Sequence, residues 1–80
     1  MDEQSIQHAM QAIVLHLRQH PQSADTLEGV HSWWVQWPGI QESILVTAEA
    51  LRSLQTAKQV ERLTVGNREL WRLARTNVDS

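Results

Sequence analysis

The chain has 80 residues, a net charge of −2 and no cysteine. This length suits one domain, and the lack of cysteine excludes stabilisation by disulfides or by Cys-ligated zinc. The start of the chain shows no signal-peptide pattern, and no apolar run approaches the roughly 20 residues that span a bilayer. We expect a cytoplasmic, single-domain protein over residues 1–80, with its core in residues 5–75 and a frayed tail at 76–80.

Charge is unevenly distributed along the chain. Residues 1–50 hold six acidic side chains and Arg18 as their one base, whereas residues 51–80 hold six bases and three acids. A bipolar chain of this kind can steer a partner or associate head to tail, while a dedicated nucleic-acid binder is usually basic overall.

Two helices are predicted in the first half. Residues 3–19 form the first, because apolar side chains recur on one helical face until Pro21 disfavours helical backbone at His20. The second begins at about Thr26, after the capping-box-like pair Asp25 and Glu28. Gly29 in its middle costs about 1 kcal/mol relative to Ala, and either a close helix crossing or a neutral surface position would account for it. The apolar face of the first helix comprises Ile6, Met10, Ile13, Val14 and Leu17, and that of the second comprises Leu27, Val30 and Trp34.

A third helix follows the break at residues 37–39. Ser43 can cap it, and it runs to about Gln55. Its expected buried stripe consists of Ile44, Ala48, Leu51 and Leu54 or Gln55. Val46 and Ala50 fall partly outside this stripe, which is typical of a central helix or of one that faces a partner.

The last third predicts a β-hairpin around the two-residue turn Gly66-Asn67. The two-residue loop sets the register and places Arg62 opposite Trp71, where a cation–π contact can form. Val60, Trp71 and Leu73 are expected to meet the helices. The predicted pairs are Val65 with Arg68, Thr64 with Glu69, Leu63 with Leu70, Arg62 with Trp71, Glu61 with Arg72 and Val60 with Leu73.

Three helices followed by a C-terminal hairpin make an α+β fold that resembles a small winged-helix domain over about residues 5–75. The resemblance rests on element order and on the hairpin. It implies that the third helix enters the DNA major groove and that the hairpin touches the flanking backbone or the minor groove. The nucleic-acid contacts that it implies are Gln41, Ser43, Thr47 and Arg52 on the helix and Asn67 and Arg68 at the hairpin turn. Weak contacts through the hairpin could also come from Arg62, Arg68, Arg72 and Arg75.

The third helix departs from that pattern. Residues 41–50 contain Glu42 and Glu49 but no base, and carboxylates repel the phosphates that a recognition helix must approach. The sequence therefore favours protein docking, and DNA binding through the hairpin is the alternative.

Four tryptophans, with no phenylalanine or tyrosine, are the second unusual feature. Trp33, Trp34 and Trp37 are the candidates for protein interaction. Neighbours on a helix point about 100° apart, so one of Trp33 and Trp34 should be in the core and the other at its rim. Core packing, an anchor for a protein partner and stacking on single-stranded bases are the three readings of this cluster, in descending order.

Histidines at positions 8, 16 and 20 fall on one face of the first helix, but no carboxylate or cysteine completes a metal site, so solvated side chains are expected. His31 is expected at a helix surface or cavity edge. No phosphate-binding loop or nucleophile motif is present. We expect a non-catalytic protein with no cofactor, metal or small-molecule substrate.

The sequence thus predicts a protein–protein interaction module. Its partner would be a second copy, in a homodimer, or a larger bacterial-type assembly of which the chain is a small subunit. A DNA-binding regulator is the alternative.

Overall fold

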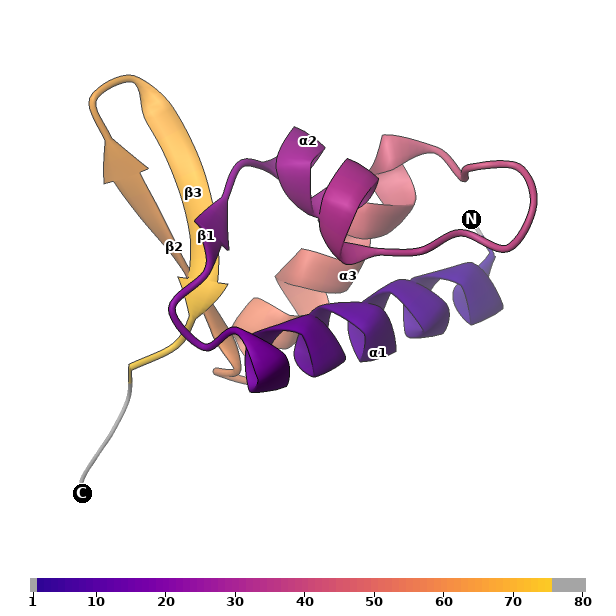
Figure 1. Cartoon of the computed structure of the whole chain (residues 1–80), viewed down its shortest axis with the longest axis horizontal. Coiled ribbons are helices and arrows are strands. Elements are labelled where there is room, and N and C mark those ends of the chain that lie inside the picture. Colours follow the sequence, from indigo (N-terminus) through magenta and orange to yellow (C-terminus); the bar gives the residue numbers. More distant parts are fainter. Residues whose placement is uncertain (1, 76–80) are drawn as a thin grey trace.

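The structure, a computed structural model, describes residues 2–75. Its elements are α1 (Glu3–Gln19), β1 (Ala24–Asp25), α2 (Leu27–Gly29), the π-helix η1 (Val30–Trp34), α3 (Ile44–Thr56), β2 (Val60–Val65) and β3 (Arg68–Leu73). The sheet stands at one end of the molecule, and α1 runs along one long side (Figure 1). The fold is α+β, with three helical regions and a three-stranded antiparallel sheet in the order β1-β3-β2.

The first helix has the predicted bounds. The Asp2 carboxylate accepts a hydrogen bond from the Gln4 N–H at 3.0 Å and caps the helix at its start. At its end, the His20 N–H still donates to the His16 carbonyl at 2.8 Å, and the turn at Pro21 follows. The predicted face packs inward, with Ala9 as an additional fully buried residue.

The segment after this turn differs from the prediction. Ala24 and Asp25 form a short strand that pairs with Arg72 and Trp71 of β3, so the hairpin gains a third strand. The cap of the second helical region is Thr26 rather than Asp25, because the Thr26 hydroxyl accepts a hydrogen bond from the Gly29 N–H at 3.1 Å. Two residues are too few to show the alternation that identifies a strand in a sequence.

Gly29 is explained by a close approach, although not by a helix crossing. A β-carbon at this position would collide with the Asp25 carboxylate, which folds back over the helix start and accepts a hydrogen bond from the Thr26 N–H at 2.8 Å. The helix becomes a π-helix directly after this glycine.

In α3 the ends were predicted correctly and the buried face only in part. Ser43 caps the helix, accepting from the Leu45 N–H at 3.2 Å. Leu51 and Leu54 are buried as expected, but Ile44 and Ala48 are only half-buried and Gln55 is exposed. The buried face is rotated because the helix is covered on adjoining sides by α1, by the second helical region and by β2. Its members are Val46, Thr47, Ala50, Leu51 and Leu54.

All six predicted pairs of the hairpin are present. Gly66 has a φ of +63°, and Asn67 has no positive φ, which is the pattern of a type II′ turn. Val60 and Trp71 are buried against the helices, whereas Leu73 is more exposed than predicted. The guanidinium of Arg62 lies 5.9 Å from the centre of the Trp71 ring, as expected.

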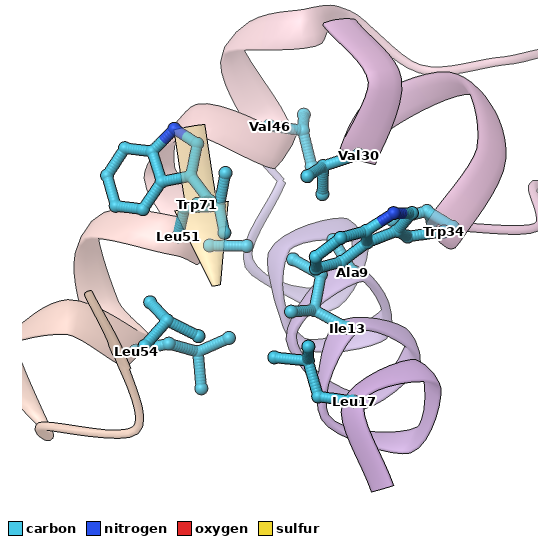
Figure 2. Close-up of a cluster of buried hydrophobic side chains, with 12 residues drawn as sticks. Ala9, Ile13, Leu17, Val30, Trp34, Val46, Leu51, Leu54 and Trp71 are labelled. Carbon is cyan, nitrogen blue, oxygen red and sulfur yellow. The ribbon is translucent and has the colours of Figure 1, made fainter. Parts of the chain in front are cut away.

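One hydrophobic core joins the helices and the sheet (Figure 2). Ile13, Val30 and Leu51 are its fully buried large apolar side chains, and Trp34 and Trp71 extend it on two sides. The core is therefore built from aliphatic side chains and two indoles, since the chain has no phenylalanine or tyrosine.

Candidate protein-docking surface

The three clustered tryptophans have three different environments. Trp33 is 78% exposed, whereas its neighbour Trp34 is 6% exposed and belongs to the core. Trp37 is half-buried, and its indole N–H donates to the His31 carbonyl at 3.0 Å. The prediction that one of the two adjacent indoles is internal and the other peripheral is confirmed.

The π-helix η1 produces this arrangement. The Val35 N–H donates to the Val30 carbonyl, five residues before it, at 3.2 Å. Val30, His31 and Trp34 face the core from this turn, and Trp33 projects from its opposite side. Single π-helical turns are rare and occur frequently at functional sites.

Beside Trp33, a groove of about 420 Å³ separates η1 from the outer face of α1. We call it the Trp33 groove. Leu15, 55% exposed, contributes a second accessible apolar side chain. None of the lining residues carries a fixed charge at neutral pH. They are His8, Gln11, Ala12, Leu15, His16, Gln19, Trp33, Trp34 and Gln36.

His8 and His16, which line the groove, make contacts that connect α1 to the segments around it. The His8 ring donates from Nε2 to the Gln36 carbonyl at 2.7 Å and lies 5.7 Å from the Trp37 ring. The His16 ring stacks on Trp34, with 4.5 Å between the ring centres and 16° between the planes, and its Nε2 is 3.2 Å from the Ser23 hydroxyl. These contacts fix the Trp34 side of the groove.

The three histidines predicted on one face of the first helix, His8, His16 and His20, do not converge on one point. His16 and His20 have ring centres 5.1 Å apart, while His8 is turned toward Gln36. Within residues 2–75, no group of three or more histidine or carboxylate side chains could hold a metal ion.

Partial burial of the His16 ring, and the nearby His20, hold the pKa of His16 below the usual 6.5, although Asp25 acts in the opposite direction. Below pH 6.5 the unfolded chain therefore binds more protons than the folded chain, and the free energy of unfolding falls as the pH is lowered.

We expect urea denaturation to give a lower midpoint at about pH 5.5 than at about pH 7.5. His16→Gln should flatten this dependence. A pH dependence that was unchanged in His16→Gln would contradict the assignment.

His31 is not at a surface or cavity edge as predicted. It is buried, and its Nδ1 is hydrogen-bonded to the hydroxyl of Thr47, which is fully buried, at 2.6 Å. Thr47 therefore cannot face DNA as the winged-helix resemblance implied, because its side chain is in the core and already paired. The bond instead ties η1 to α3.

Apart from the half-buried Arg72, the other predicted nucleic-acid contacts are exposed, and three of their five arginines are paired with carboxylates. Arg52 lies 3.5 Å from Glu49, Arg62 lies 3.6 Å from Glu69, and Arg72 lies 2.7 Å from Glu61. The hydrogen bond from Arg72 holds the pKa of Glu61 below its usual value. Gln41, which was predicted on the third helix, lies in the loop before α3, and Ser43 caps that helix. Asn67 and Arg68 lie at the hairpin turn, so these exposed residues do not form one cluster.

Leu15 and Ala12 are the apolar groove residues that the sequence did not reveal. Both lie outside the apolar stripe predicted for α1, and an exposed leucine alone signals nothing because folded surfaces hold many. Leu15 becomes part of a candidate site because Trp33, which belongs to η1, lines the same groove.

No protein-family model, curated protein or solved structure matches this chain. Within residues 2–75, no helix has the length and apolar character needed to cross a membrane.

Proposed function

We propose that the chain is a protein-interaction module on a winged-helix-like scaffold and that Trp33 is its anchor. The observation that carries this proposal is the exposed indole of Trp33 beside an uncharged groove. Tryptophan is enriched among the residues that dominate binding energy, and such residues tend to pair with hot spots on the partner. The element order supports the scaffold, and β1 enlarges the sheet that includes the hairpin.

Within residues 2–75, the hollows beside two other exposed apolar side chains, Leu73 and Ile40, are smaller and include charged residues in their lining. Ile40, 91% exposed, lies in the loop before α3, and Val65 is at the hairpin tip. Only Trp33 and Leu15 among the exposed large apolar residues line the groove. This combination of a knob and an adjacent hollow supports docking at the Trp33 groove.

The test is site-specific crosslinking from position 33 in cells, using a photo-reactive aromatic residue. We expect a discrete crosslinked protein from position 33 and none from position 65, which is also exposed but lies on the hairpin. With that protein purified, Trp33→Ala should weaken binding by about 30-fold or more, because a hot-spot truncation costs about 2 kcal/mol or more. Equal crosslinking from both positions, or unchanged affinity, would refute the proposal.

DNA binding through the hairpin is the second candidate, favoured by one observation. Arg68 is exposed at the hairpin turn and takes part in no ion pair within residues 2–75. Two features weigh against it. Helix-turn-helix units join their helices by a turn of about three or four residues, whereas residues 35–43 separate η1 from α3, and the remaining hairpin arginines are paired with glutamates.

Titration of a labelled random DNA duplex, followed by fluorescence anisotropy, separates the two candidates. A protein-docking module should leave the anisotropy unchanged even at low salt. Tight binding that falls steeply with added salt and weakens in Arg68→Ala would instead establish the DNA-binding candidate.

A further inference from the structure

We infer that the occupant of the Trp33 groove is a second copy of this chain, with the two α1 helices antiparallel about a two-fold axis at Gln11. This inference rests on the proposed function, because it names the partner of the same surface. It follows from the charge pattern of α1, the chemistry of its exposed side chains and the position of Trp33.

The charges of α1 are complementary to those of its own reversed copy. Glu3 stands at one end and Arg18 at the other, and residues 4–17 contain no acidic or basic side chain except histidine. Antiparallel pairing brings each Glu3 toward the partner copy's Arg18, and the two-fold axis then falls midway, next to Gln11. The same placement suits the helix dipole within each copy. Parallel pairing would instead bring like charges together at both ends.

The side chain on the axis can pair with itself. Gln11 is exposed, and its amide both donates and accepts hydrogen bonds. A two-fold interface brings a surface against its own copy, so residues on the axis must be compatible with themselves. A charged residue at the axis would meet a like charge, whereas an amide can hydrogen-bond to its symmetry mate.

Trp33 supplies the apolar contribution. It projects from η1 beside the groove that also contains Ala12 and Leu15, so each copy presents a knob and a hollow on one face. Pairing along α1 places each indole against the helix of the partner copy. In Figure 1 the outer side of α1 forms a long edge of the molecule, and in this view no other helix or strand of residues 2–75 lies beyond it.

A stable contact sets a requirement on the size of the face. A specific interface buries about 800 Å² on each partner, which is roughly one seventh of the 5422 Å² of accessible surface. The 17 residues of α1 extend for about 25 Å, at about 1.5 Å per residue. A stable dimer would therefore have to use the length of α1 together with η1, and not the groove alone.

Sedimentation equilibrium on the full chain tests the inference. We expect a concentration-dependent dimer. Gln11→Glu and Gln11→Lys should each be monomeric because a like charge meets itself at the axis, and a one-to-one mixture of the two should recover the dimer. Trp33→Ala should raise the dissociation constant by about 30-fold or more. Gln55→Glu, the same substitution at an exposed position of α3, should dimerise like the wild type.

A wild-type chain that stays monomeric up to about 1 mM would overturn the inference. The proposed function would stand in that case if crosslinking from position 33 still identified a different protein. A dimer that resists both Gln11→Glu and Trp33→Ala would overturn the second-copy assignment, since self-association would then use another face. Circular dichroism spectra matching the wild type show that each variant is folded.

Discussion

Replacing Trp34 with alanine is expected to lower the free energy of unfolding by about 3–5 kcal/mol, the usual result of truncating a buried tryptophan. The indole fills the core between η1 and α1 (Figure 2) and carries the stacked His16 ring on its outer side. Natural domains are stable by only about 5–15 kcal/mol, and small ones tend toward the lower value. The variant should therefore be partly unfolded at 37 °C, as judged by urea denaturation followed by far-UV circular dichroism.

The neighbouring residue provides a matched control. Trp33→Ala removes the same side chain from the same turn, but the indole is mostly in solvent, so the free energy of unfolding should change by no more than about 0.5 kcal/mol. Both measurements belong at low protein concentration, where self-association adds no stability. If the two variants lost equal stability, the assignment of Trp34 to the core and Trp33 to the surface would be wrong.

Elements that depend on local sequence were predicted well. The bounds of α1 follow from its apolar spacing and from Pro21, and the cap of α3 is set by Ser43. The hairpin register follows from the two-residue turn at Gly66, because a one-residue shift would reverse the face of every side chain. In each of these elements, the residues that determine the structure are close together in the chain.

Elements that depend on distant contacts were missed. The strand β1 exists because Ala24 and Asp25 meet β3, almost 50 residues later in the chain, and nothing in the dipeptide encodes that pairing. The buried face of α3 likewise depends on which elements surround it, so Ala50 replaced Ala48 as a core residue. Helical periodicity defines which residues share a face but does not determine how that face is rotated toward the core.

The candidate site was half predictable for the same reason. The tryptophan cluster and the divergence of Trp33 from Trp34 follow from composition and helical geometry. Leu15 belongs to the site because η1 packs against α1, which the sequence does not show. Thr47 is buried because it is hydrogen-bonded to the inward-facing His31, so its predicted exposure was wrong. A short polar side chain on a predicted helix can serve a surface contact or a buried hydrogen bond, and its own sequence neighbourhood does not distinguish them.

The bond between His31 and Thr47 carries the second large expected effect. Thr47→Val keeps the side-chain volume but removes the hydroxyl, and the His31 Nδ1 then loses its partner inside the core. A buried polar group left unpaired costs about 1–3 kcal/mol, so the variant should lose that much free energy of unfolding. Thr56→Val, the same change at an exposed position of α3, is the control and should have little effect.

A double-mutant cycle with His31→Leu separates the hydrogen bond from packing. If the bond is the source of the loss, the double variant His31→Leu/Thr47→Val should be more stable than the two single losses predict, by about 0.5–3 kcal/mol. Additive losses would show that the two side chains act only by filling space. The backbone carbonyl of His31 also accepts a hydrogen bond from the indole N–H of Trp37. The Trp37 indole signal in a ¹H–¹⁵N spectrum should therefore shift in Thr47→Val. That shift would show that the buried pair positions the turn from which Trp33 projects, and it would link the stability of the core to the geometry of the docking surface.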